Sequence, residues 1–179
     1  MLVDKYEIGK KMIALAEQYS QMGDKLSINA DKQLTAGEIT DDKYHELCSQ
    51  VDKIFKQATV IHKEVAKLTA GSIEADLDGI ENVTKDMEEA VERINRIKNI
   101  VNITMETITA VGTVVLACST PNPATILAAV AATQKLANDI IAMTGPPVTV
   151  PPIIPGTQKT KKSVSAKSKI AVRAKVLKN

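Results

Sequence analysis

Three acidic residues at alternate positions imitate the start of a calcium-binding loop. Glu74, Asp76 and Asp78 are followed directly by Gly79, and such a loop presents its first carboxylates and its glycine in this order. The twelfth position of the loop requires a bidentate carboxylate, but Lys85 occupies it. The stretch also lies on the apolar seam of an expected helix, so we expect no calcium site.

A histidine and a cysteine stand three residues apart and could share one face of a helix. His45 and Cys48 would supply two ligands, whereas a zinc site takes three or four, and His62 lies more than four helical turns further on. We expect a partly buried thiol beside an exposed imidazole. The sequence therefore predicts no metal site and no cofactor.

Other patterns of catalytic chemistry are missing from the sequence. There is no phosphate-cradling glycine loop, no nucleophile elbow and no carboxylate pair that stands out from ordinary helix-surface charge. With two histidines, most acid–base mechanisms lack their usual side chain. We expect a protein that is not an enzyme and that has no small-molecule substrate.

The composition indicates one domain with a core of aliphatic side chains. The 179 residues are 44% hydrophobic and 25% charged, which is ordinary for a globular protein. One Phe, three Tyr and no Trp leave the core to Ile, Leu, Val, Ala and Met, which suits close helix packing. So few rings argue against stacking on sugars or on single-stranded nucleic acid.

Two helices follow from the spacing of apolar residues in the first 70 positions. The first is expected from about Val3 to Leu34, with apolar residues three or four apart, at Tyr6, Met12, Leu15, Tyr19, Met22 and Leu26. The second begins after Thr40 as N-cap and ends at Ala70-Gly71. Its spacing alternates between three and four, a heptad seam of Tyr44, Leu47, Val51, Ile54, Ala58, Ile61, Val65 and Leu68.

A third helix is expected from near Ser72 to Cys118, with a change of register. Its first seam comprises Ile73, Leu77, Ile80, Thr84, Met87, Val91 and Ile94. At Lys98 the pattern fails and resumes one place earlier, through Ile97, Val101, Met105 and Ile108. If the helix is unbroken, the apolar residues after it project beyond a three-helix part. If it bends sharply, they fold back into one compact bundle.

No charged side chain occurs from Thr107 to Gln134. Ser119–Pro123 breaks this stretch, because two prolines cannot continue a helix, and a fourth helix is expected from Ala124 to about Thr144. The predicted fold is all-α: an elongated antiparallel helical bundle or coiled coil of about four helices over residues 1–144, with an apolar helical hairpin at about 107–134.

Each charge-free arm of this hairpin is too short to cross a bilayer alone. Thr107–Cys118 and Ala124–Gln134 have 12 and 11 residues, about 17 Å of helix against a hydrocarbon core of about 30 Å. Two spanning helices are therefore not expected in a lone molecule. The hairpin is buried, or its tip enters one leaflet or spans after oligomerisation, or it contacts another protein. The candidate partner- or membrane-facing residues are Val111, Val114, Val115, Leu116, Pro121, Pro123, Ile126, Leu127 and Val130.

The chain ends in a proline-rich linker, residues 145–156, and a basic, flexible tail, residues 157–179. Residues 1–156 carry 15 basic and 21 acidic side chains, a balance of −6, whereas the tail carries 8 basic and no acidic ones. The tail is a solubilising segment, folds back on the acidic body, adds a strand to a partner's sheet, or binds anionic lipid or nucleic acid. Its candidate anion-binding residues are Lys159, Lys161, Lys162, Lys167, Lys169, Arg173, Lys175 and Lys178.

The cysteines and the first residues bear on the cellular compartment. Cys48 and Cys118 lie 70 positions apart and do not form a disulfide framework. The first 20 residues have acids inside their apolar pattern, unlike a secretory signal. We expect a cytoplasmic protein by default, with membrane association or signal-independent export as alternatives.

The leading functional expectation is a non-enzymatic structural or assembly protein that binds copies of itself or a partner by coiled-coil-type association. The alternative is a membrane-active protein, pore-forming or peripheral, whose 107–134 hairpin enters a bilayer while the tail contacts anionic lipid. A weaker alternative is non-specific nucleic-acid binding by the tail.

Overall fold

The computed structural model describes residues 5–66 and 77–145, which belong to one compact unit, Met1–Pro146. These residues form five α-helices and one short 3₁₀ helix, and no strand occurs among them. The all-α fold class predicted from the sequence is confirmed. Residues 146–156 of the predicted linker, the predicted tail, and residues 67–76 with Leu68, Ile73, Glu74 and Asp76 lie outside the described residues.

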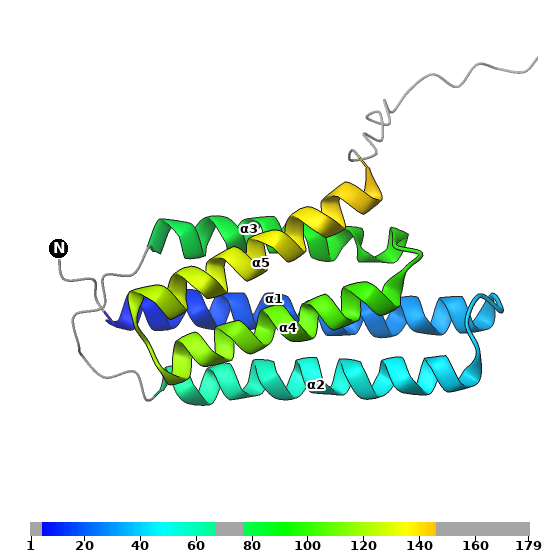
Figure 1. Ribbon diagram of the computed structural model, residues 1–179, viewed down its shortest axis with the longest axis horizontal. Coiled ribbons are helices and arrows are strands. Elements are labelled where there is room, and N and C mark those ends of the chain that lie inside the picture. The colour runs from blue at the N-terminus through cyan, green and yellow to red at the C-terminus, as the bar shows by residue number, and fades with distance from the viewer. Residues whose placement is uncertain (1–4, 67–76, 146–179) are drawn as a thin grey trace, which may run out of the picture. The chain divides into compact units, whose positions relative to one another are not determined.

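Consecutive α-helices run in opposite directions (Figure 1). The elements are α1 (Lys5–Thr35), α2 (Asp41–Val65), α3 (Leu77–Arg93), the 3₁₀ helix η1 (Ile94–Arg96), α4 (Ile100–Ser119) and α5 (Pro123–Thr144). Helix α1 contacts α2, α3, α4 and η1, and further contacts join α2 to α4, α4 to α5 and α5 to α3. Helix α1 therefore packs along α2, α3 and α4, and it meets α5 at the contact between Tyr19 and Thr133.

Helix α2 has the N-terminus and the buried face that the sequence predicts. The Thr40 hydroxyl accepts a hydrogen bond from the Lys43 amide, and two aspartates occupy the first turn, where the helix dipole favours negative charge. The predicted seam is buried at Leu47, Val51, Ile54, Ala58 and Ile61. The heptad pattern of α2 is thus satisfied by the helices packed around it, α1 and α4.

Two glycines of α1 lie where this helix approaches α2 closely. A Cβ atom on Gly23 would stand 2.9 Å from a ring carbon of Phe55, and one on Gly9 would stand 3.1 Å from Val65. Both glycines lower the intrinsic helix propensity of α1. They are nevertheless placed where a larger side chain would separate the two helices.

The third helix expected from the sequence is broken, so the structure has five α-helices instead of about four. After η1, Ile97 adopts an extended backbone with φ −80° and ψ 127°, and Asn99 precedes α4 with φ −93° and ψ 68°. The chain therefore turns back between Arg93 and Ile100. The register change near Lys98 marks this turn, and the reading with a sharp bend is the one that the structure adopts.

The seam predicted after the turn is not the buried face of α4. Val101 and Ile108 are half-buried and Met105 is 49% exposed. The buried positions include two threonines and are Ile100, Ile103, Thr104, Thr107, Ala110, Val111, Val114, Ala117 and Cys118. Because α4 starts as a new helix, its buried face need not continue the register of α3. Two of its buried positions are threonines, so a pattern of apolar residues alone does not identify this face.

Candidate functional site

The charge-free residues singled out in the sequence form the joined ends of α4 and α5, which pack against each other. We call residues 100–144 the α4–α5 hairpin. Its turn is capped locally: the Asn122 side chain accepts from the Thr125 amide, the Thr125 hydroxyl accepts from the Asn122 amide, and Pro123 occupies the start of α5. This capping box with a following proline starts a helix without help from other elements.

The predicted partner- or membrane-facing residues divide between the core and the surface. Val111, Val114 and Ile126 are buried against the other helices, and Val115 and Val130 are half-buried. The exposed members stand close to the turn and are Leu116, Pro121, Pro123 and Leu127. We call these four residues the tip patch.

Exposed apolar side chains are concentrated on the hairpin. Leu116 is 53% exposed and Leu127 62% exposed. Among the described residues the large exposed hydrophobic side chains are Tyr6, Ile28, Met105, Leu116, Leu127 and Met143, so four of them belong to the hairpin. Small exposed residues of α5 extend this surface, at Ala124, Ala128 and Ala131.

Both helices of the hairpin are long and apolar enough to cross a membrane. Helix α4 has 20 residues and mean hydropathy 1.6, and α5 has 22 residues and mean hydropathy 1.3, which correspond to about 30 and 33 Å of helix. The most apolar 18-residue stretches of α4 and α5 are 44% and 33% buried, so the two helices meet this criterion by length and composition alone. The arms of 12 and 11 residues considered in the sequence are the charge-free parts of these longer helices.

The three charged side chains of the hairpin are neighbours in space. Lys135 and Asp139 are 2.5 Å apart on α5, and the pKa of Lys135 is raised by its hydrogen bond to Asp139, then by the charges of Asp139 and Glu106. Glu106 stands 13 residues before the end of α4 and Lys135 stands 12 residues after the start of α5. Both therefore lie about 18–20 Å along their helices from the turn.

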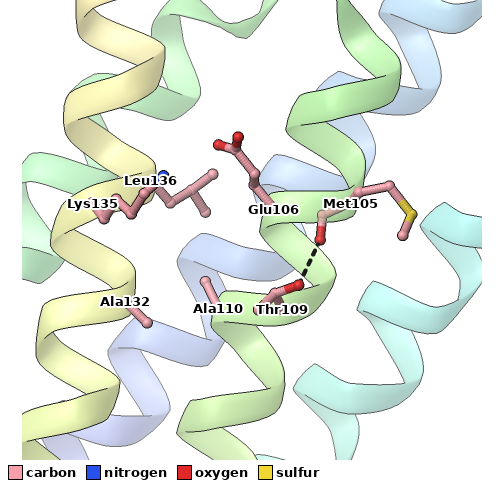
Figure 2. A pocket seen from close by; sticks show the side chains of 7 residues that line it. All are labelled: Met105, Glu106, Thr109, Ala110, Ala132, Lys135 and Leu136. Atoms are coloured by element: carbon pink, nitrogen blue, oxygen red, sulfur yellow. Dashed lines mark hydrogen bonds between the residues drawn. The ribbon is translucent and has the colours of Figure 1, made fainter.

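A shallow groove between the two helices is lined by two of these charged side chains, Glu106 and Lys135. The groove has a volume of about 260 Å³ and is lined by Met105, Glu106, Thr109, Ala110, Ala132, Lys135 and Leu136 (Figure 2). Figure 2 shows the Glu106 carboxylate between the two helices, above the facing side chains of Ala110 and Ala132. One Glu106 carboxylate oxygen is buried and has no hydrogen-bond partner. The surface of the hairpin is thus apolar near the turn and charged further along.

Few polar contacts connect the hairpin to the rest of the described chain. The Tyr19 hydroxyl lies 2.8 Å from that of Thr133, and the Thr107 hydroxyl lies 3.3 Å from the Met22 sulfur. Gln134 donates to Asp86 of α3 at 2.8 Å, and the Arg93 guanidinium donates to the Gly145 carbonyl at 2.6 Å. Burial of apolar surface therefore supplies most of the attachment.

Cys118 is buried near the end of α4, 4% exposed. Burial, and secondarily the charge of Glu64, raise the pKa of its thiol to about 12. A thiol in this state is a poor nucleophile at neutral pH, because the thiolate is the reactive form. Cys118 can therefore report whether the hairpin leaves its place.

The other candidate ligands of the sequence do not converge in the described part of the chain. His45 is exposed and packs edge to face on Tyr44, with ring centroids 5.8 Å apart, while Cys48 is half-buried. No group of three His, Cys, Asp or Glu side chains suited to a metal ion occurs among the described residues. Glu74, Asp76 and all eight basic residues of the tail lie outside them.

The charge-free stretch could be predicted from the sequence, whereas its division into buried and exposed residues, and the grouping of Glu106, Lys135 and Asp139, required the structure. Comparison of the chain with models of known families, with curated proteins and with solved structures finds no match.

Proposed function

We propose that this chain is a non-enzymatic, membrane-active protein that inserts the α4–α5 hairpin, turn first, into a lipid bilayer. The observation that carries the proposal is the layout of the hairpin. Two adjacent apolar helices end in an exposed tip patch, and their three charges lie together about 18–24 Å from the turn.

The length of the charge-free part matches one leaflet. The hydrocarbon core of a bilayer is about 30 Å thick, so one leaflet contributes about 15 Å. Insertion to that depth brings Leu116 and Leu127 into hydrocarbon and leaves Glu106, Lys135 and Asp139 at the interface. The Lys135–Asp139 pair further reduces the penalty of bringing charge near lipid.

The basic tail fits the same role. Its eight basic residues and no acidic ones attract anionic headgroups, with each Lys or Arg near the surface contributing about 1 kcal/mol. We expect the tail to bring the chain to the membrane and the hairpin to anchor it. Deletion of residues 157–179 should weaken binding to anionic vesicles most strongly at low salt.

A flotation and dye-release assay with vesicles of mixed neutral and anionic phospholipids tests the proposal. Leu116→Asp and Leu127→Asp place charges on exposed sites of the tip patch and should reduce flotation and release at least tenfold. Ile28→Asp is the matched control, because Ile28 is a comparably exposed aliphatic residue of α1, 45% exposed. Equal loss in all three variants, or no binding of the parent chain at low salt, contradicts insertion by the hairpin.

The second candidate is association through helix faces, with another copy or a protein partner, as a structural or assembly component. It is favoured by the exposed apolar side chains of the hairpin, which a partner helix could cover in a coiled-coil-type contact. The α2 seam gives it less support, because the residues of that seam are already buried. Sedimentation of the parent and of Leu127→Asp distinguishes the candidates: association predicts a concentration-dependent oligomer that this substitution dissociates.

Nucleic-acid binding by the tail is a third proposal, favoured only by its charge. Phosphate contacts of Lys and Arg are independent of sequence and weaken steeply with salt. The chain should then be retained on any duplex DNA, and deletion of residues 157–179 should abolish retention.

A further inference from the structure

We infer that the α4–α5 hairpin is a preassembled unit that separates from α1, α2 and α3 as a whole, and that Tyr19, Asn29 and Gln33 of α1 hold it in place. The inference rests on the proposed insertion of the hairpin and adds how insertion is controlled. It is carried by three independent features: the backbone before α4, the polar contacts made by α1, and the hydrogen bonds within the hairpin.

The backbone before α4 has the form of a hinge. Helix α3 ends at Arg93, η1 follows, and Ile97 is extended before α4 starts at Ile100. The N-cap residue Asn99 makes no side-chain capping bond. A rotation of the backbone within residues 97–99 therefore moves α4 without breaking a continuous helix.

Two buried amides of α1 clamp this hinge. The Asn29 side-chain nitrogen donates to the Ile94 carbonyl at 2.9 Å and to the Ile97 carbonyl at 3.0 Å. The Gln33 side-chain nitrogen donates to the same Ile97 carbonyl at 3.2 Å and to the Asn29 side-chain oxygen at 3.3 Å. Asn29 is 4% and Gln33 5% exposed. These bonds fix the direction in which α4 leaves the hinge.

Tyr19 forms a latch at the middle of α5. The Thr133 hydroxyl donates its single proton to the Ala129 carbonyl of its own helix at 2.8 Å. It must therefore accept the bond from the Tyr19 hydroxyl, at 2.8 Å in a fully buried position. When the hairpin leaves, Thr133 keeps its helical bond and Tyr19 alone loses a partner.

The hairpin satisfies its own hydroxyl groups. Each of its threonines donates to a carbonyl within the hairpin, and these are Thr104, Thr107, Thr109, Thr113, Thr120, Thr125, Thr133 and Thr144. A hydroxyl bonded in this way can enter hydrocarbon without an unsatisfied donor. The threonine hydroxyls of the hairpin thus keep their hydrogen bonds when it leaves, whereas the bond from Gln134 to Asp86 is broken.

In water the closed arrangement is favoured, because opening exposes the buried faces of α1, α2 and the hairpin itself. A bilayer removes part of this penalty by covering the hairpin. Apolar burial supplies most of the stability of the closed arrangement, and the polar contacts of α1 and α3 add to it. Weakening them should accelerate opening without changing what the hairpin does in lipid.

The experiment uses the full chain and removes single donors. Tyr19→Phe deletes the latch hydroxyl and retains the ring, and Gln33→Met deletes one donor of the clamp and retains the side-chain length. Tyr44→Phe is the matched control, because the Tyr44 hydroxyl interacts with Asp31 of α1 and Cys48 of α2, and neither belongs to the hairpin. Each variant is made with Cys48→Ser, so that Cys118 is the single thiol.

The first readout needs no lipid: the rate at which a thiol reagent labels Cys118 in the native state. Tyr19→Phe and Gln33→Met should accelerate labelling about 2- to 10-fold, the range expected for one neutral hydrogen bond, and Tyr44→Phe should not. The labelling rate should also respond to urea more weakly than global unfolding does, because only part of the buried surface is exposed.

The second readout is the rate of vesicle insertion, which should increase by the same factor with an unchanged final extent. Faster labelling without vesicle binding supports the latch and refutes the proposed function. Vesicle binding with labelling unaffected by Tyr19→Phe and Gln33→Met refutes the latch and leaves the proposed function standing. Labelling that follows global unfolding in its urea dependence also refutes separation of the hairpin as a unit.

Discussion

Buried polar side chains of α1 are the residues on which the position of the hairpin depends. Asn29, Gln33 and Tyr19 lie on the same helix as a long apolar face, and each directs a donor at another element. Apolar packing alone tolerates rearrangement, whereas a buried donor requires its acceptor in one place. These side chains thus give a ring-poor core a specific geometry.

Asn29→Leu should destabilise the fold by about 1–3 kcal/mol, because it leaves the Ile94 carbonyl with one fewer donor and removes the Asn29 bond to the Ile97 carbonyl. Urea unfolding followed by circular dichroism measures the effect. Asn102→Leu, at an exposed position of α4, is the control and should change stability by less than about 0.5 kcal/mol. Equal effects of the two substitutions would argue that the clamp contributes nothing.

The Cys118 thiol makes stability depend on alkaline pH. Burial raises its pKa from an ordinary value of 9.0 to about 12, so the unfolded chain loses this proton at lower pH than the folded chain. The contribution is complete below about pH 9 and decreases as pH rises toward 12, by at most about 1.4 kcal/mol per pH unit. Cys118→Ala removes it. From pH 8 to pH 11 the unfolding free energy of the parent should decrease relative to that of Cys118→Ala. A difference between the two that does not change with pH would disprove the burial effect.

At the scale of elements, α4 and α5 differ from the other helices in how they hold their polar groups. Helices α1, α2 and α3 carry charged side chains on their exposed faces, whereas the hairpin has one charged residue on α4 and two on α5. Its remaining polarity is largely threonine bonded to its own backbone. A helix whose hydroxyls bond its own backbone brings no unsatisfied hydroxyl donor into an apolar environment.

The turn of the hairpin should be rigid because its cap is complete. Asn122→Ala removes the acceptor for the Thr125 amide and should reduce stability by about 0.5–2 kcal/mol. Asn138→Ala, at an exposed position inside α5, is the contrast, since alanine favours a helix interior. Thermal unfolding of both variants measures this, and a smaller loss for Asn122→Ala than for Asn138→Ala would contradict the capping account.

Much of this element structure is predictable from spacing. The heptad of α2, its Thr40 cap and the Pro-Asn-Pro start of α5 are local features, and they agree with the structure. The rotation of α4 is not predictable in this way, because Thr104 and Thr107 are buried while Met105 is exposed. Gly9 and Gly23 lower the helix propensity of α1, and their presence is explained by the close approach of α2, which the sequence does not show.

The candidate site was predictable in part for a similar reason. Absence of charge from Thr107 to Gln134 marks the hairpin, but it does not separate the buried Val111 and Val114 from the exposed Leu116. Burial depends on contacts between distant segments, as with the bond from Tyr19 to Thr133. A pattern along one helix contains no information about which neighbour covers it.

At the scale of the whole molecule, the proposed contact with an anionic membrane is supported by the distribution of charge along the chain. Residues 1–156 carry a balance of −6 and residues 157–179 one of +8. An acidic body is repelled by anionic lipid, so the proposed function assigns the attraction to the tail and the lasting attachment to the hairpin. The two contributions can be separated by experiment: deletion of the tail should reduce the salt dependence of binding, and substitutions in the tip patch should not.

The most direct measurement places an environment-sensitive fluorophore on the tip patch. A cysteine at Leu127, in a chain with Cys48→Ser and Cys118→Ala, carries the label, and a cysteine at Ile28 serves as reference. On addition of anionic vesicles, the label at position 127 should shift to the blue and be quenched by lipid-embedded quenchers, while the label at position 28 should not. A chain that binds vesicles with both labels remaining in water would contradict insertion of the hairpin.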